Sequence, residues 1–369
     1  MKADATVKTL QLGLVGPVPP PNGGMAMQTQ QLARLLQSEG IAVDLLATNG
    51  QYRPAFMAGV PVIRALFRLI PFLFALWRLA GRVDVIHLMA NSGWSWQLHC
   101  APTLWLGWLR STPVVVNYRG GEAGTYFARS FRRVRPSLRK AAAVVVPSGY
   151  LQALFRQFGE TTRIIPNIID RELFHPRTGR TPGTFTLVVT RNLEAIYGID
   201  TAIRAFAQVL AGDSSVRLRI AGSGPAETSL RELVRDLDID EAVSFEGRLD
   251  RPGIVALYAE ADAMLNPSTV DNMPNSVLEA LACGLPVIST DVGGVPFIVC
   301  HRETALLIPP SDINAMAEAI RELKGNAALR RTLSSSGLAE LEQYTWPRVR
   351  RQWLALYTNL SGTPQKVTS

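Results

Sequence analysis

Residues 269–296 read TVDNMPNSVLEALACGLPVISTDVGGVP and hold the most informative pattern in the chain. A loop bearing Asp271 leads directly into a predicted helix. Pro274 stiffens the approach, and Asn275 or Ser276 suits the capping position. Backbone N–H groups at such a helix start, together with the helix dipole, favour an anion such as a diphosphate. The stretch therefore predicts a ligand-binding loop that joins a buried strand to a helix.

A second acid, Glu279, follows Asp271 eight residues later, in the expected first turn of that helix. A carboxylate there can accept two hydrogen bonds from a vicinal diol such as that of ribose. An ordinary capped helix with an acidic first turn would explain Ser276 and Glu279. It does not explain Asp271 or the later Gly293-Gly294 pair, so we favour a binding site.

Outward from this stretch, short apolar runs alternate with amphipathic segments along the whole chain. The runs are rich in Val, Ile and Leu, as buried parallel strands are. Strands are expected at 10–15, 41–47, 83–89, 113–117, 142–147, 163–165, 185–190, 216–221, 243–246, 263–265, 286–289 and 305–308. Helices are expected at 25–38, 62–81, 95–110, 149–158, 199–211, 226–237, 254–260, 276–283, 312–324, 327–342 and 346–359. This alternation predicts an α/β protein with two doubly wound parallel sheets.

The 369 residues are too many for one ordinary core and suit two domains. A Pro- and Gly-rich segment at 166–182 is the expected linker. It separates a domain at 1–168 from a domain at 169–345. Ligands of doubly wound folds bind at the carboxyl ends of the strands, so the cleft between the two domains is the expected site.

Composition and charge narrow the possible settings. A chain that is 47% hydrophobic and 18% charged is not disordered, and three cysteines without a C-x-x-C pair give no disulfide framework. We expect a cytoplasmic protein, because the run at 10–15 is too short for an export signal. The longest apolar stretch, 69–77, is too short to span a membrane. Residues 1–176 carry a net charge of +11 and the remainder −3, which favours an anionic partner for the first half.

The acidic pair resembles a known signature. Seven residues separate Asp271 from Glu279, and EALACGLPV follows at 279–287. This is similar to the nucleotide-sugar-binding signature of family 4 glycosyltransferases, retaining enzymes of the GT-B fold, although Asp271 replaces the more usual Glu. Six further stretches match the family in order: PNGG (21–24), DVIH (84–87), IPNIID (165–170), VRLRIAGSGP (216–225), VSFEG (243–247) and ADAMLNPS (261–268).

The resemblance implies roles for individual residues. Glu279 would hold the ribose, Asp271 the transferred sugar and Arg191 the diphosphate, which makes these three the expected catalytic residues. Two glycines would let the backbone approach the diphosphate closely. The expected substrate-binding residues are Gly23, Gly24, Arg119, Gly222, Gly247, Arg248, Asn272, Met273, Pro274, Asn275 and Ser276.

The resemblance also implies a GT-B architecture, in which two Rossmann-like domains face a cleft and the C-terminal helix, 346–361, joins the first domain. The implied reaction moves a hexose-type sugar, with retention, from a UDP- or GDP-sugar to a glycan or lipid-linked acceptor in polysaccharide biosynthesis. No enzyme nucleophile takes part: the leaving diphosphate accepts the acceptor proton on the same face.

Two departures from the family keep alternatives open. Tyr197 stands where the family has a lysine, and Arg119 stands where it has a histidine. A non-catalytic nucleotide-sugar-binding protein is one alternative, although the retained Asp271, Glu279 and Arg191 argue against it. The other is an epimerase or hydrolase of the same fold, which would need an acid/base pair that the sequence does not show.

No cofactor and no metal are expected. The D-x-D spacing in 236–240 lies at the end of a predicted helix and is typical of solvated charges. The histidines, His87, His99, His175 and His301, have no ligand spacing. His87 could line the cleft or be structural.

Residues 60–82 predict a basic amphipathic helix. Arg64, Arg68, Arg78 and Arg82 fall within about 80° of one another, and apolar and aromatic residues fill the other face. A second basic cluster at 129–140 and four of the seven tryptophans lie nearby. Such a helix favours an anionic membrane surface, with the protein peripheral on the inner face of the membrane and no nucleic-acid partner. The alternative is a helix that merely covers its own sheet.

Overall fold

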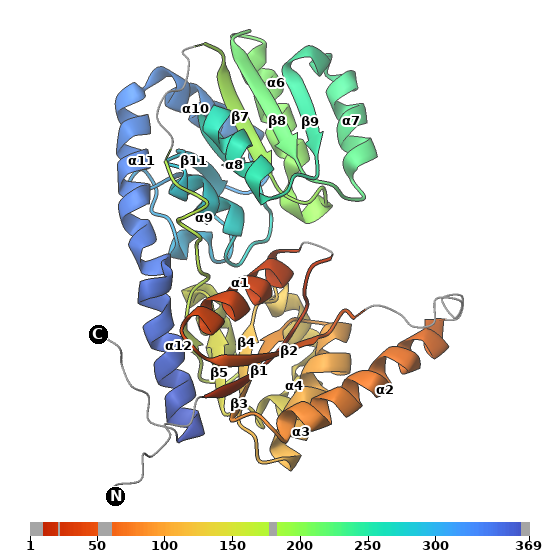
Figure 1. Ribbon diagram of the computed structural model, residues 1–369. Helices are drawn as coiled ribbons and strands as arrows, with labels where there is room; N and C mark the ends of the chain where they lie inside the picture. Colours follow the sequence, from red (N-terminus) through yellow and green to blue (C-terminus); the bar gives the residue numbers. More distant parts are fainter. Residues whose placement is uncertain (1–9, 21–22, 51–60, 177–182, 363–369) are drawn as a thin grey trace, which may run out of the picture. The chain divides into compact units, whose positions relative to one another are not determined.

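The computed structural model describes residues 10–20, 23–50, 61–176 and 183–362, of which 61–68 are described by their backbone alone. The chain divides into two compact units. Unit 1 comprises Met1–Ile168 with Val349–Ser369, and unit 2 comprises Ile169–Arg348. Both are built from parallel sheets covered by helices (Figure 1).

Unit 1 holds a six-stranded sheet in the order β2-β1-β3-β4-β5-β6, with parallel pairing throughout. Its strands are β1 (Gln11–Gly16), β2 (Ala42–Ala47), β3 (Val85–Ala90), β4 (Val114–Tyr118), β5 (Ala143–Val146) and β6 (Arg163–Ile164). Every residue of β3 and β4 is buried, which explains why these runs are apolar on both faces. The strand order reverses between β1 and β3.

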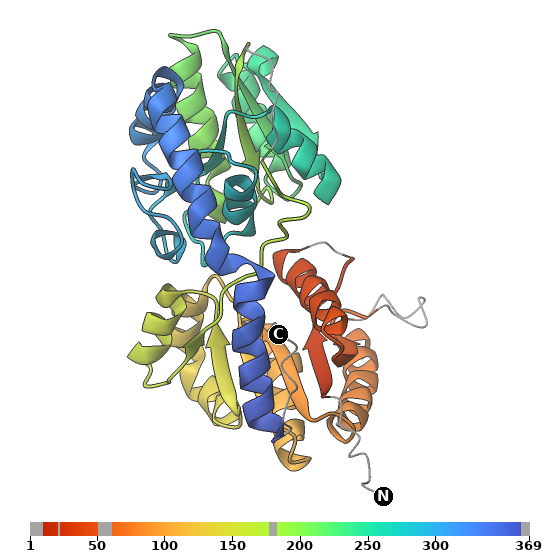
Figure 2. The ribbon, with the colours of Figure 1, turned by 60° about the vertical axis from the view of Figure 1, so that its left-hand side comes forward.

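The helices of unit 1 cover this sheet. They are α1 (Gly24–Ser38), α2 (Pro61–Ala80), α3 (Ala101–Leu109), α4 (Ala123–Leu138), α5 (Gly149–Gln157) and most of α12 (Trp346–Ser361). A π-helical turn, Trp96–Cys100, leads into α3. Helices α1 and α12 lie side by side (Figure 2), and Arg350 of α12 pairs with Glu39 at the end of α1 at 2.9 Å.

Unit 2 holds a second six-stranded parallel sheet, in the order β12-β11-β10-β7-β8-β9. Its strands are β7 (Phe185–Thr190), β8 (Val216–Ala221), β9 (Val243–Gly247), β10 (Ala263–Asn266), β11 (Val287–Thr290) and β12 (Leu306–Ile308). Its helices are α6 (Ile199–Leu210), α7 (Glu227–Asp236), α8 (Arg251–Glu260), α9 (Asn275–Ala282), α10 (Ile313–Gly325) and α11 (Ala327–Glu340). One apolar cluster joins the sheet to α6, α7 and α10, and another joins it to α8 and α9.

The predicted fold class, two doubly wound parallel sheets, is confirmed. Each expected strand is present within two residues of its predicted limits. No helix among the described residues is long and apolar enough to cross a membrane.

Helix α4 was not predicted. Its apolar residues Phe127, Phe131, Val134 and Leu138 are all buried, and they recur at spacings of three and four. Arginines occupy exposed positions between them, so the segment resembles a basic cluster in the sequence. The helix becomes recognisable only when the spacing of the apolar residues is considered without the arginines. The sequence therefore did contain the signal for this helix.

Candidate functional site

The sheet of unit 2 changes direction between β7 and β10. The chain runs from β7 outward through β8 and β9, and then returns to place β10 on the other side of β7. The loops that follow β7 and β10 consequently diverge, and ligands of doubly wound sheets bind at such a point. Arg191 directly follows β7 and Asp271 lies in the loop after β10, so both reach this position.

The two residues are bonded to each other. The Arg191 Nη2 atom lies 2.7 Å from Asp271 Oδ2, and the two side chains are 11% and 10% exposed. Arg191 Nη1 donates to the hydroxyl of Ser276 at 3.3 Å. The ring of Tyr197 lies under the guanidinium, with its centroid 4.1 Å from Cζ. The structure thus gathers Arg191, Asp271 and Ser276, three of the predicted site residues, into one cluster.

The backbone beneath this cluster is tightly packed. A Cβ at Gly222, whose φ is +156°, would lie 1.9 Å from the carbonyl oxygen of Arg191. The neighbouring Leu193 N–H donates to the carbonyl of Ser223 at 3.1 Å. Gly222 was predicted to contact substrate, but in this structure it packs against the segment that carries Arg191. Its N–H donates to the carbonyl of Gly247, another predicted residue, at 2.8 Å.

Helix α9 begins one residue earlier than predicted. Pro274 occupies the capping position, so the expectation of Asn275 or Ser276 as the cap is wrong. The side chain of Pro274 makes no capping hydrogen bond. The hydroxyl of Ser276, the second residue of α9, instead accepts a hydrogen bond from Arg191 Nη1. The positive end of the helix dipole thus lies beside the Arg191 cluster.

Most of the predicted loop is buried. Asn272, Met273 and Pro274 are buried and Asn275 is half-buried. The backbone N–H of Asn272 donates to Asp271 Oδ1 at 2.9 Å, and the N–H of Gly294 donates to the carbonyl of Asp271 at 3.1 Å. These bonds hold Asp271 from both its side chain and its backbone.

Glu279 is the fifth residue of α9 and therefore lies beyond the first turn, contrary to expectation. It is half-buried, and no hydrogen bond or ion pair joins its carboxyl group to any described residue. Burial raises its pKa to about 7, against the lowering effect of the positive charges on Arg251 and Arg191. Glu279 is thus a partly buried acid without a protein partner, as is typical of a ligand-binding residue in a protein without its ligand.

Two residues around Glu279 were missed by the sequence analysis. Arg251 opens α8, pairs with Asp170 at 3.2 Å and adds positive charge near Glu279. The Asp-Arg-Pro start of α8 was a readable helix signal. The buried Tyr258 hydroxyl lies 2.6 Å from Thr190 Oγ1 and donates to the Ser276 carbonyl at 3.2 Å, which fixes the start of α9 to the end of β7.

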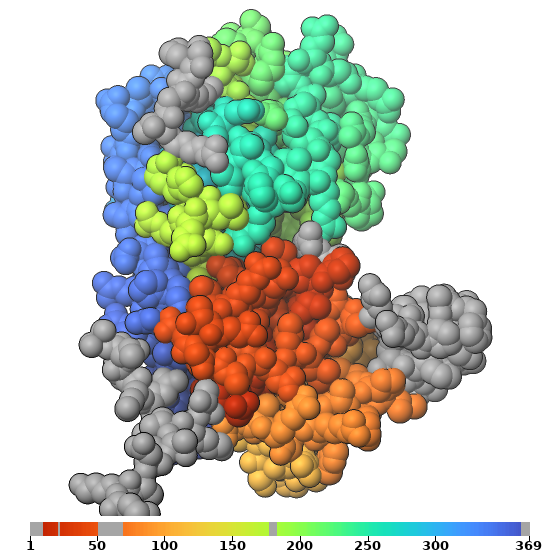
Figure 3. All heavy atoms as spheres, in the orientation of Figure 1, coloured from red at the N-terminus to blue at the C-terminus, as the bar shows by residue number. Residues whose placement is uncertain are grey.

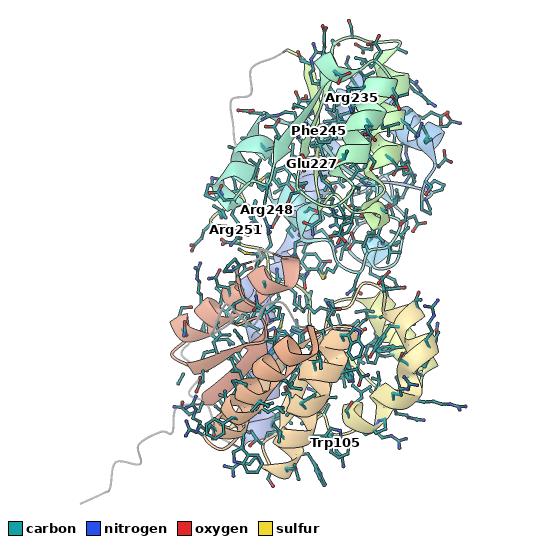
Figure 4. All side chains as sticks on the ribbon, turned by 90° about the vertical axis from the view of Figure 1, so that its right-hand side faces the viewer. Trp105, Glu227, Arg235, Phe245, Arg248 and Arg251 are labelled. Carbon is teal, nitrogen blue, oxygen red and sulfur yellow. The ribbon has the colours of Figure 1, made fainter. Side chains whose placement is uncertain are left out.

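The predicted Arg248 is exposed just beyond β9. Figure 4 shows it at the same end of unit 2 as Arg251, whereas Arg235 on α7 lies at the other end. Arg248 is therefore accessible to a ligand at the edge where the strands end.

Unit 1 carries the remaining predicted residues. Gly23 directly precedes α1, Gly24 is its first residue, and a Cβ at Gly23 would meet nothing within 4 Å. There is therefore room beside the backbone of Gly23 for an approaching group, and Gly24 is exposed. This placement follows the strand-order reversal of unit 1, since α1 follows β1.

Arg119 directly follows β4 and is half-buried. Its Nε donates to Asn117 Oδ1 at 3.1 Å and its Nη1 donates to Asn167 Oδ1. Burial lowers its pKa to about 10, and no carboxylate among the described residues pairs with it. Arg119 is thus a cation at a strand end that is held by amides alone.

His87 is fully buried, so it does not belong to an open site surface. Asn117 Nδ2 donates to His87 Nε2 at 3.0 Å, and burial, followed by the charge of Arg119, lowers the His87 pKa to about 3. His87 was expected either to line the cleft or to be a structural residue, and this buried environment fits the structural role. No group of three or more His, Cys, Asp or Glu side chains within the described ranges could hold a metal ion.

Solved structures superpose on nearly the whole length of this chain. A sucrose-phosphate synthase from Thermosynechococcus elongatus superposes with a TM-score of 0.78 at 23% identity, over 96% of this chain and 100% of that one. HepE of Anabaena, in complex with UDP, superposes with a TM-score of 0.76 at 19% identity, over 95% and 100%. The fold is therefore GT-B.

The sequence matches the family described as glycosyl transferases group 1 over residues 170–338 and the glycosyl transferase 4-like domain over residues 23–167. The chain belongs to this glycosyltransferase family, as its motifs predicted.

Curated relatives differ in activity. An exopolysaccharide phosphotransferase of Streptomyces coelicolor is 35% identical over 53% of this chain and 20% of its own length. A GDP-mannose-dependent phosphatidylinositol monomannoside mannosyltransferase of Corynebacterium glutamicum is 29% identical over 64% and 67%. A putative colanic acid biosynthesis glycosyltransferase of Escherichia coli is 30% identical over 41% and 39%. The chain thus spans less than half the length of two of these three relatives.

Proposed function

We propose that this protein transfers a hexosyl group, with retention, from a UDP- or GDP-sugar to a hydroxyl group of a glycan or lipid-linked precursor in polysaccharide biosynthesis. The observation that carries the proposal is the cluster of Arg191, Asp271 and Ser276 at the switch point, beside the unpartnered Glu279. A cation, a helix start and an acid without a partner are together suited to a nucleoside diphosphate. Family membership supports the same class of donor.

Each group has a role in the proposed reaction. The bond between the anomeric carbon and the diphosphate oxygen breaks, and the acceptor oxygen bonds to the same face of that carbon. The acceptor proton passes to an oxygen of the leaving diphosphate. Arg191 and the start of α9 stabilise the charge that develops on this diphosphate, which is the main catalytic contribution. Asp271 holds hydroxyls of the sugar and Glu279 holds the ribose.

UDP-glucose and GDP-mannose are suitable first probes, because relatives bind or depend on them. We expect one donor to be consumed only when a glycan or polyprenyl-linked acceptor is present, and NMR of the product to show a retained anomeric configuration. Arg191→Ala should abolish turnover. Arg235→Ala is the matched control, since it removes the same charge from an exposed position at the other end of unit 2 (Figure 4).

The same assay separates the alternatives. Donor consumption without any acceptor would identify a hydrolase, and isomerisation of the donor sugar would identify an epimerase. Donor binding without any turnover would identify a binding protein. An inverted product would refute retention while leaving the donor site intact.

We further propose that unit 1 works at an anionic membrane surface. Among the residues that the structure describes, nine of the ten exposed large apolar side chains belong to unit 1. Six of them lie on two neighbouring helices, at Ile70, Phe74 and Trp77 of α2 and at Trp105, Trp108 and Leu109 of α3. These six define the aromatic surface. Figure 3 shows α2 and α3, in orange, at the outside of unit 1.

Cations accompany the aromatic surface. Arg78 lies 4.2 Å above the Phe74 ring, Arg110 lies 4.6 Å above Trp77, and Lys140 lies 3.9 Å above Trp108. Aromatic side chains interleaved with basic ones suit the headgroup region of a bilayer that carries negative charge.

The structure revises the predicted basic face. Arg82 lies beyond the end of α2 and pairs with Asp44. The side chains of Arg64 and Arg68 lie outside the described residues. Helix α2 also has two apolar faces, because Leu76 and Leu79 are buried against the sheet while Phe74 and Trp77 are exposed. The covering role and the membrane role are therefore compatible.

Vesicle co-sedimentation tests this proposal. We expect binding to vesicles of phosphatidylglycerol that weakens with salt, and little binding to phosphatidylcholine. A Trp105→Ser and Trp108→Ser double variant should lose most of the binding. Phe297→Ser, at an exposed large apolar residue of unit 2, should bind like the parent. A parent protein that ignores anionic vesicles at low salt would point to an acceptor in solution.

A further inference from the structure

Tyr197 forms one face of the environment of Arg191. The guanidinium of Arg191 lies over its ring, with the ring centroid 4.1 Å from the guanidinium carbon. Asp271 and Ser276 take hydrogen bonds from the two terminal nitrogens of the guanidinium at 2.7 and 3.3 Å. The guanidinium is therefore held by the ring on its face and by acceptors on its edge.

The position of Tyr197 is itself fixed by the loop that carries Asp271. Tyr197 ends the short helical turn Ala195–Tyr197, and Gly198 follows with a φ of +56°. A Cβ at Gly198 would lie 2.3 Å from the carbonyl oxygen of Pro267, so the two loops touch through their backbones. The N–H of Thr269 donates to the carbonyl of Ile196 at 2.8 Å. These backbone contacts therefore fix the Tyr197 ring, the Arg191 guanidinium and the Asp271 carboxylate relative to one another.

The bonding of Arg191 is incomplete in this state. Its Nε atom is buried and has no hydrogen-bond partner among the described residues. An aromatic ring attracts a guanidinium through its face while leaving the N–H groups free for acceptors in the plane. A ring can therefore hold the cation in place while the acceptors at its edge are exchanged.

We propose that Tyr197 is a positioning residue that keeps Arg191 in place when the donor diphosphate replaces Asp271 as its acceptor. Asp271 is then released to the hydroxyls of the transferred sugar. This inference rests on the proposed function, in which Arg191 binds the diphosphate. Tyr197 stands where the family has a lysine. A lysine there would add a second positive charge, whereas the neutral ring of Tyr197 orients the charge of Arg191.

The ring and the hydroxyl of Tyr197 can be separated by substitution. Tyr197→Phe keeps the ring, and its affinity for UDP or GDP should stay within about 2-fold of the parent value. Tyr197→Leu removes the aromatic face at similar volume and should weaken this affinity about 10-fold, within the range of a partly desolvated cation–π contact. The affinity for uridine or guanosine, which lack phosphate, should not change in either variant. Equal losses in the Phe and Leu variants, or an equal loss for the nucleoside, would overturn the inference.

A double-mutant cycle tests whether Tyr197 acts through Arg191. Arg191→Gln should weaken UDP or GDP binding, and adding Tyr197→Leu to it should cause no further loss. If Arg191→Gln leaves the affinity unchanged, the proposed diphosphate site is wrong. If Arg191→Gln weakens binding and Tyr197→Leu does not, only the role of Tyr197 is wrong. Thermal melting shows whether the Tyr197→Leu variant is folded. If it is not, Tyr197→His, which has a smaller ring, takes its place and should lose an intermediate amount of affinity for UDP or GDP. A Tyr197→His variant that binds as tightly as the parent would contradict the inference.

Discussion

The Nδ1 atom of His87 on β3 lies 2.6 Å from the hydroxyl of Tyr357 on α12, although 270 positions separate the two residues in the sequence. Asn117 donates a hydrogen bond to the other ring nitrogen, Nε2, so the proton of the neutral imidazole is on Nδ1. The Nδ1–H group therefore donates to the Tyr357 hydroxyl. Trp353 packs on the imidazole with its ring centroid 4.6 Å away. This buried contact attaches the last helix to the sheet of unit 1.

Tyr357→Phe should destabilise unit 1. The substitution removes the acceptor of a buried N–H, and we expect the free energy of unfolding to fall by about 1–3 kcal/mol. Urea denaturation followed by tryptophan fluorescence measures the change. Gln352→Ala, on the exposed face of the same helix, is the control and should unfold like the parent. Equal stability of the two variants would show that the contact does not hold α12 in solution.

Donor binding should depend on the ionisation of Glu279. Only the carboxylate accepts two hydrogen bonds from the ribose, and its pKa in the free protein is about 7. The affinity for a nucleotide sugar should therefore fall by about tenfold between pH 8 and pH 6, as titration calorimetry can measure. Glu279→Ala should weaken binding by about 1.5–3 kcal/mol at pH 8. Glu279→Gln should bind weakly at both pH values, and a parent-like pH profile in this variant would assign the titration to another group.

The same residue should reduce stability at high pH. The folded pKa of Glu279 lies above its usual value of 4.5, so its favourable contribution to stability is complete below pH 4.5 and is lost as the pH rises through 7. We expect Glu279→Gln to raise the free energy of unfolding at pH 8 by on the order of 1 kcal/mol, and to leave it unchanged at pH 4.5. Denaturation at the two pH values checks the sign. A destabilised variant at pH 8 would mean that a partner stabilises the ionised form.

Transferase activity should persist in EDTA. The proposed reaction stabilises the leaving diphosphate through Arg191 and the start of α9. Complete loss of activity in EDTA, restored by magnesium or manganese, would contradict this mechanism. The matched control is a metal-dependent glycosyltransferase assayed in the same buffer.

Gly222→Ala should destabilise unit 2 and displace Arg191. The added Cβ would lie 1.9 Å from the Arg191 carbonyl oxygen, at a φ of +156° that other residues rarely adopt. We expect a loss of about 2 kcal/mol or more in the free energy of unfolding, together with weaker nucleotide binding. Gly212→Ala is the matched control, since its Cβ would approach no atom closer than 3.9 Å. A Gly222 variant as stable as the Gly212 variant would show that the two loops can separate freely.

The sequence by itself determined the strands, most of the helices and the family. A buried parallel strand is an apolar run of a few residues, and the loop from Asp271 to Ser276 is contiguous, so both can be recognised locally. Helix α9 begins only one residue earlier than predicted, and this small shift places Glu279 just beyond the first turn. Helix α4 was also encoded locally and was missed because arginines separate its apolar residues.

Only the tertiary structure decided which distant residues meet. Arg191 pairs with Asp271 across 80 positions because β7 and β10 are neighbours in the sheet, an order that no local pattern records. His87 became a neutral core residue because α12 returns to β3. The outward orientation of Phe74 and Trp77 likewise depends on how α2 packs, since an apolar residue on a helix reads the same whether it faces a sheet or solvent. Local periodicity fixes the elements, whereas contacts between them arise only when the strands have been ordered.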